Sequence, residues 1–573
     1  MNNKYFFLLP VLILLILNIF NNFGIMYRSI IFEVLLLIIA LFFGSRVVLK
    51  EYSSSHLQVE YSKNQFNLSI VTISIIFGLL SFFILSINLD RFDFQEDEFQ
   101  VVSTAVGHYH ENNFYKWNFI QNISGKYTTC VENDPFCNYT RAWPHTLLIS
   151  KSYNQFGISE WSSRIVSVVF GALFAFMSIL ISYLLFKDVK VSLLVGFSVI
   201  FYVNYIEIFR TTRMYALLIP FFLLLMIFTY YALIKKFVLL NELFKNNKFV
   251  KFYQKYFNFN PIFILIALIL LMINYILHIN SLILLVFSYF FLIFLLLKYK
   301  NEYKYKIIFI FLTFLLIILI IFGFVSRYDE FISFFAVFNI EYLWLLLNHP
   351  FSITLNVLFL SLGTIYMFKD SNIQDLLVYT YLALITSAMF FIFIAYRYIS
   401  YNYISHLSII VILVVIFSFV KTLNLISKNT IFQSIMIILF IMVIISHFST
   451  SVERIYLVDQ NKGEFSTAYK TILDNFDSVN DVLISQYLRD YYMQGLVLNN
   501  SVSLLNSRRF SFEKFEDAIQ TYEQGWVVWE VSKSNHIKVE IIIYAFENFK
   551  QYHGTGIDST NVNVFYFNSS MIN

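Results

Sequence analysis

The feature that most constrains this chain is a series of long apolar runs along most of its length. Of its 573 residues, 58% are hydrophobic and only 13% are charged, whereas a soluble globular protein is about 25% charged. A helix needs roughly 20 apolar residues to cross a bilayer, so the runs predict a polytopic α-helical membrane protein with about 13 transmembrane helices. The predicted spans are 5–20, 30–49, 68–88, 162–186, 191–207, 213–234, 261–277, 279–297, 307–325, 351–368, 376–394, 407–420 and 431–446.

Lysine-rich loops predict the orientation of these spans. The loop 235–260 holds six lysines and one acid, the loop 298–306 holds four lysines and one acid, and Lys421 and Lys428 lie in a third. Because positive loops stay in the cytoplasm, these three loops are expected there. The segments expected on the outside of the plasma membrane are 89–161, 326–350, 395–406 and 447–573.

The composition divides the chain into three predicted parts. Residues 1–67 carry two additional N-terminal spans, and residues 68–446 form the main membrane domain with the large external loop 89–161. After Ser446 the sequence becomes mixed. Strand-like runs at 481–485, 526–531 and 562–567 alternate with helical patterns at 511–523 and 535–550. Residues 447–573 are therefore predicted to be a small extracytoplasmic α/β domain.

An acidic pair, Asp97-Glu98, opens the external loop's one amphipathic helical pattern, from about Asp97 to Glu111. Adjacent helical side chains point about 100° apart, so the two carboxylates cannot face one reacting atom. We expect Asp97 to act and Glu98 to orient or bind. A carboxylate here could accept a proton or hold a divalent metal, although the sequence requires no metal. The alternative is a solvated acidic loop in which Glu98 favours the helix dipole.

Basic groups fall at the same predicted membrane face. Arg210 and Arg213 flank two threonines, and guanidinium groups suit the phosphate of a lipid. The alternatives are snorkelling side chains or an ion pair with Glu207. His278 and Arg397 also lie at outer span ends, where a structural histidine and an interfacial anchor are the plainer interpretations.

The two cysteines of the chain, Cys130 and Cys137, lie in the external loop. An extracytoplasmic location favours a disulfide between them, and two free thiols are the alternative. The chain has no P-loop, no glycine-rich dinucleotide motif and no nucleic-acid signature. A nucleotide-activated substrate also has no cytoplasmic domain to hold it, so an activated donor is expected to come from the lipid phase.

In this order, the motifs resemble membrane-embedded C-type glycosyltransferases (GT-C fold), in the protein O-mannosyltransferase and aminoarabinose transferase group, family 39. The resemblance covers residues 68 to about 420. It rests on the acidic pair and on Arg141-Ala-Trp-Pro144-His145, Gly157-Ile-Ser-Glu160-Trp-Ser-Ser-Arg164, Arg210-Thr-Thr-Arg213-Met-Tyr215, His278 and Arg397-Tyr398. Two features depart from the family pattern: the two N-terminal spans, and His145 where a second proline is common.

The resemblance implies inverting transfer of a sugar from a polyprenyl-phosphate donor to a glycan, lipid or protein acceptor outside the cytoplasm. Asp97 would be the base beside Glu98. The expected phosphate-binding residues are Arg210, Arg213 and Arg397, and the expected substrate-binding residues are His278, Tyr215, Tyr398, Arg164 and His145.

Two other functions remain open from the sequence. A polymerase or ligase of lipid-linked oligosaccharides would use similar chemistry but needs no folded external domain. A transporter or flippase would place its charges near the bilayer midplane and show paired repeats, whereas here the charges lie at span ends.

Overall fold

The structure, a computed structural model of the chain, divides into two compact units. Unit 1 comprises Met1–Leu85, Val168–Phe209 and Met214–Ser451, and unit 2 comprises Ser86–Ser167, Arg210–Arg213 and Val452–Asn573. The residues described are 3–22, 36–46, 68–90, 93–94, 96–119, 122–124, 142–234, 260–278, 281, 283–299, 305–306, 308, 313, 341–371, 373–393, 401–452, 465–477, 480–485, 490–493, 501–503, 512–530, 539–553 and 562–568.

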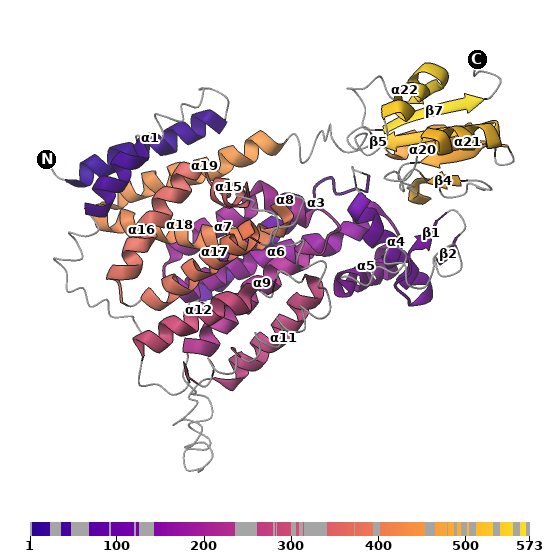
Figure 1. The fold of residues 1–573 in the computed structure, drawn as a ribbon. Coiled ribbons are helices and arrows are strands. Elements are labelled where there is room, and N and C mark those ends of the chain that lie inside the picture. Colours follow the sequence, from indigo (N-terminus) through magenta and orange to yellow (C-terminus); the bar gives the residue numbers. More distant parts are fainter. Residues whose placement is uncertain are drawn as a thin grey trace, which may run out of the picture. The chain divides into compact units, whose positions relative to one another are not determined.

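Unit 1 is helical, and its elements are drawn in Figure 1. Among the residues described, five helices are long and apolar enough to cross a membrane, or up to seven if each of two bent pairs is one span. The helices described are α1 (Asn3–Asn22), α3 (Leu68–Ser86), α6 (Glu160–Phe186), α7 (Val189–Phe201), α8 (Val203–Phe209), α9 (Tyr215–Ile234), α11 (Pro261–Leu277), α12 (Ile283–Lys298), α15 (Glu341–Asn348), α16 (Ile353–Lys369), α17 (Gln374–Phe393), η3 (Tyr401–Tyr403), α18 (Ser405–Ile426) and α19 (Thr430–Val452). The first part of α6, up to Ser167, belongs to unit 2.

Burial explains where these helices lie within unit 1. The helix α18 is apolar around its whole circumference, and it is buried along most of its length against α16, α7, α9 and α17. By contrast, α3, α11 and α19 expose large apolar side chains such as Leu79, Met272 and Ile431. Apolar faces of this extent suit contact with lipid rather than water.

Most predicted spans coincide with helices, and two breaks were not predicted. The run 191–207 is divided into α7 and α8, which meet at 60°. The helices α15 and α16 meet at 85°, and α15 lies in the segment expected to be the loop 326–350. Of the predicted span 307–325 only residues 308 and 313 are described, and of the span 30–49 only 36–46.

Unit 2 contains two helices from the predicted external loop, α4 (Glu96–Glu111) and α5 (Trp143–Phe156). They pack on each other and enclose an apolar cluster that includes Phe94 and Tyr153. Between them lie two antiparallel strands, β1 (Trp117–Asn118) and β2 (Ile123–Ser124). A Cβ atom on Gly107 would lie 2.0 Å from the carbonyl oxygen of Tyr115, so glycine lets the chain pass against α4.

Unit 2 also contains the C-terminal α/β domain, which confirms the predicted fold class. Its five-stranded sheet has the order β4-β3-β5-β7-β6, with β3 parallel to β4 and β5, and β7 antiparallel to β5 and β6. The elements are α20 (Phe465–Leu473), β3 (Val482–Ser485), η5 (Asp490–Met493), β4 (Ser501–Ser503), α21 (Phe512–Tyr522), β5 (Gln524–Glu530), α22 (Val539–Asn548), β6 (Lys550–His553) and β7 (Val562–Asn568). The helix predicted at 535–550 ends at Asn548 in the structure, and the last residue of the prediction belongs to β6.

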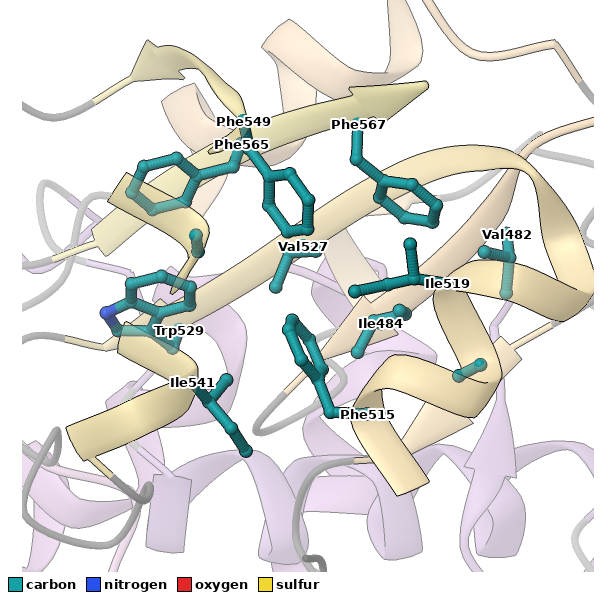
Figure 2. Packing of buried hydrophobic residues seen from close by; sticks show 12 residues of the cluster. Val482, Ile484, Phe515, Ile519, Val527, Trp529, Ile541, Phe549, Phe565 and Phe567 are labelled. Carbon is teal, nitrogen blue, oxygen red and sulfur yellow. The ribbon is translucent and has the colours of Figure 1, made fainter. Parts of the chain in front are cut away.

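Both faces of this sheet are buried. Along β5, Val527 and Trp529 belong to one core cluster, and Trp526 and Val528 belong to the other. This alternation follows the two-residue period of a strand. Figure 2 shows the first cluster, where Phe515 and other residues of α21 and α22 face the strand residues, and Trp529 stacks on Phe565 at 4.7 Å.

Candidate functional site

The acidic pair occupies the first turn of α4, and its two carboxylates have different environments. Glu98 is buried, with 1% of its surface exposed. The side chain of Asp97 is 61% exposed and forms an ion pair with Arg213. The two side chains diverge as the helical geometry predicts.

Glu98 is held by a buried arginine. The Nε and Nη2 groups of Arg164 donate to the two carboxylate oxygens of Glu98 at 3.1 and 3.0 Å. The backbone N–H of Thr212 donates to the same carboxylate at 2.7 Å. Arg164 is itself 4% exposed and also donates to the carbonyl oxygens of Leu89 and Asp93. A buried charge pair needs such additional bonds to offset its desolvation.

Arg210 has a similar structural environment. It is buried, and it donates to the carbonyl oxygens of Ile87 and Asn88 at 2.6 and 3.2 Å. Arg213 is 22% exposed beside Asp97. Arg213 is therefore the more exposed of the two arginines in this segment, and its guanidinium is paired with the Asp97 carboxylate.

Arg164 and His145, which were predicted to contact the substrate, are both buried in this structure. Arg164 is used for Glu98 and backbone carbonyls. His145, 1% exposed, lies in α5 with Nε2 at 3.4 Å from the Ser167 hydroxyl. Burial lowers the pKa of His145 to about 3, so the ring is neutral at physiological pH. Both residues stabilise the site from within.

Two other predicted substrate-binding residues lie together in unit 1. The ring of His278, at the C-terminal end of α11, is 5.7 Å from that of Tyr215, at the start of α9. Both rings contact Tyr403 of η3, with centroid distances of 6.0 and 6.3 Å. No pattern in the sequence had pointed to Tyr403. Arg397, Tyr398, Cys130 and Cys137 lie outside the described residues.

The arrangement at the acidic pair does not fit a divalent metal held by both carboxylates. Both oxygens of Glu98 face donors of Arg164, and one of them also accepts from Thr212. The carboxylate of Asp97 diverges from this buried group and meets a guanidinium. Among the residues that the structure describes, no three His, Cys, Asp or Glu side chains form a group that could hold a metal ion.

Comparisons with known proteins identify the fold. No family model and no curated protein sequence matches the chain. Two solved structures of ArnT from Cupriavidus metallidurans do match. The one bound to undecaprenyl phosphate has a TM-score of 0.51 at 10% identity, covering 88% of this chain and 99% of that chain. The apo structure has a TM-score of 0.50 at 9% identity, covering 88% and 98%.

The chain has the fold of ArnT. That fold is GT-C, so the predicted fold class is confirmed. With its apolar helices, the chain is an integral membrane protein. At 9–10% identity the likeness establishes the fold alone.

Proposed function

We propose that the protein is a glycosyltransferase that moves a sugar from a polyprenyl-phosphate donor to an acceptor on the outer side of the membrane. The observation that carries this proposal is the exposed Asp97–Arg213 pair beside the buried Glu98–Arg164 pair. On a GT-C fold, this arrangement offers one accessible carboxylate and one accessible guanidinium on a rigid support. The structure of ArnT bound to undecaprenyl phosphate gives a precedent for a lipid of this class.

In the proposed reaction, the acceptor hydroxyl attacks the anomeric carbon of the sugar. A new C–O bond forms to the acceptor, and Asp97 takes the hydroxyl proton. The bond between the anomeric carbon and the phosphate oxygen breaks, and its electron pair leaves with the lipid phosphate. Attack from the opposite face inverts the anomeric centre. Arg213 offsets the charge on the departing phosphate.

The finer assignments belong to this proposal. They are membership of family 39 with a mannosyltransferase-like donor, the extracytoplasmic position of the site and of residues 447–573, and the Cys130–Cys137 disulfide. We retain Arg397 as a second phosphate ligand, and His278, Tyr215 and Tyr398 as substrate contacts. The three predicted parts 1–67, 68–446 and 447–573 remain our functional division of the chain.

The test is to incubate the purified protein with labelled polyprenyl-phosphate sugars and to measure which label leaves the lipid. Asp97→Asn keeps the size of the side chain but removes the base, so transfer should fall by about 10²-fold or more. Asp90→Asn is the matched control, because Asp90 is an exposed aspartate a few residues before α4. Near-full transfer by a folded Asp97→Asn protein would refute the role of Asp97.

Arg213→Ala tests the donor side of the site. It removes the accessible guanidinium and should raise KM for the lipid donor more than it lowers kcat. Lys151→Ala, at an exposed position of α5, is the control for loss of a positive charge.

The same assay separates the two other functions. A polymerase or ligase would release longer glycans, and a transporter would move labelled lipid across a vesicle membrane without releasing sugar.

A further inference from the structure

A four-residue turn of the C-terminal domain contacts the segment that leads into α4. In η5, the hydroxyl oxygen of Tyr492 accepts a hydrogen bond from the backbone N–H of Phe94 at 2.7 Å. Close by, the backbone N–H of Ser466 donates to Asp93 Oδ2, also at 2.7 Å. Residues 398 and 373 positions further along the sequence therefore hold two consecutive residues just before the acidic pair.

The neighbouring tyrosine packs beneath the same segment. The ring of Tyr491 meets Phe94 and Phe119 edge to face, with centroids 5.2 Å apart in each case. Its hydroxyl donates to Glu160 Oε2 at 3.2 Å. Phe94 is fully buried by these contacts. Burial raises the pKa of both tyrosines, most strongly for Tyr492, so each remains a neutral phenol across the physiological range.

These contacts continue to the acidic pair. The guanidinium of Arg164 lies 5.3 Å from the centre of the Phe94 ring and donates to the Asp93 carbonyl oxygen at 3.1 Å. The same guanidinium binds Glu98, the neighbour of Asp97. A shift of Asp93 and Phe94 would therefore move both the ligand of Glu98 and the start of the helix that carries Asp97.

We propose that Tyr491 and Tyr492 are positioning residues through which the C-terminal domain sets the orientation of the Asp97 carboxylate. This inference rests on the proposed function, because it assigns a role in the transfer step to a domain outside the reacting groups proposed above. General-base catalysis depends on placing the base within hydrogen-bond reach of the proton it takes. A small displacement of the base lowers kcat while donor binding is retained.

The first readout is hydrogen exchange in the intact, detergent-purified protein, and it does not require knowledge of the substrate. Tyr492→Phe removes the hydroxyl and leaves the Phe94 amide without its acceptor. Loss of one hydrogen bond of ordinary strength should accelerate exchange of the peptide covering residues 93–99 about fivefold. Exchange of β5 at the centre of the domain sheet should not change. Tyr522→Phe, the same substitution on α21 of the same domain, is the control and should change neither peptide.

The second readout is transfer itself. Tyr492→Phe should lower kcat about fivefold and leave KM for the donor unchanged. In the Asp97→Asn background the same substitution should cause no further loss, because its effect passes through Asp97. A residue that only holds the domain together would lower transfer equally in both backgrounds and would also loosen β5.

Unchanged exchange at residues 93–99, or equal losses of transfer in the two backgrounds, would overturn the inference. If the protein without substitutions transfers no sugar at all, the proposed function fails. Exchange at residues 93–99 then decides by itself whether the tyrosines position the start of α4. The double variant Tyr491→Phe/Tyr492→Phe should enlarge the exchange effect, since it also removes the bond to Glu160.

Discussion

Removing either partner of the buried pair Glu98–Arg164 should be costly, and removing both should cost less than the two single losses added together. Arg164→Met leaves the Glu98 carboxylate buried, with the Thr212 N–H as its remaining donor among the contacts described above. It also leaves the carbonyl oxygens of Leu89 and Asp93 without this donor. Breaking one side of a buried ion pair costs about 3–5 kcal/mol.

Glu98→Met should cost a similar amount or slightly less, because Arg164 keeps its two carbonyl acceptors. In the double variant neither charge of this pair remains. Its loss should therefore be smaller than the sum of the single losses by roughly 2–3 kcal/mol. For a unit of about 150–250 residues, 1 kcal/mol corresponds to about 2–4 °C in Tm, so the double variant should melt at least about 4 °C above the additive expectation.

The assay is thermal unfolding of the four purified proteins in one detergent at one scan rate, since irreversible unfolding makes the apparent Tm depend on that rate. Lys298→Met is the control, because it breaks the ion pair with Asp375, whose partners are 27% and 17% exposed. Partly exposed pairs of this kind contribute about 0–1 kcal/mol. Additive losses from Glu98→Met and Arg164→Met would refute the argument that the two charges depend on each other.

Two further substitutions test other parts of unit 2. The pKa of His145 is about 3 in the folded protein, against an ordinary value of 6.5. Below pH 6.5 the unfolded state therefore takes up a proton that the folded state does not. The equilibrium constant for unfolding should then rise by up to about tenfold for each pH unit. The fall in Tm between pH 7.5 and 5.5 should be smaller in His145→Asn; an equal fall would contradict the assignment. Gly525→Ala should destabilise the C-terminal domain by about 1–3 kcal/mol, because its Cβ would lie 2.2 Å from the carbonyl oxygen of Val482. Faster tryptic cleavage should reveal this, whereas Gly157→Ala, where the Cβ meets open space at φ +73°, should show only a smaller effect from backbone strain.

Sequence patterns correctly predicted the helices and strands whose own residues show a clear periodicity or a continuous apolar run. The amphipathic pattern 97–111 became α4, and the strand-like runs 481–485, 526–531 and 562–567 became β3, β5 and β7. The short strands β4 and β6 were missed, since three or four largely polar residues at the edges of a sheet have no clear alternation. The break between α7 and α8 was missed because the run is apolar on both sides of Tyr202.

At the site, the sequence located the acidic pair but could not assign its partners. The Glu98–Arg164 pair joins residues 66 positions apart, and the Phe94–Tyr492 bond joins residues 398 positions apart. Such pairings depend on tertiary packing, which no local pattern encodes. Without them, the buried and the exposed arginines could not be told apart, so Arg164 and Arg210 were expected to meet substrate.

The two outer strands of the C-terminal sheet also affect how neighbouring copies of the protein can meet. An open sheet edge offers unpaired N–H and C=O groups on which another chain can add a strand. Here one edge is β4, described over Ser501–Ser503, and the other is β6, where an irregularity between Gln551 and His553 interrupts the register with β7. A bulged strand is a poor template for intermolecular pairing. Copies crowded together in one membrane should therefore resist aggregation through the β6 edge of this sheet, even at high expression.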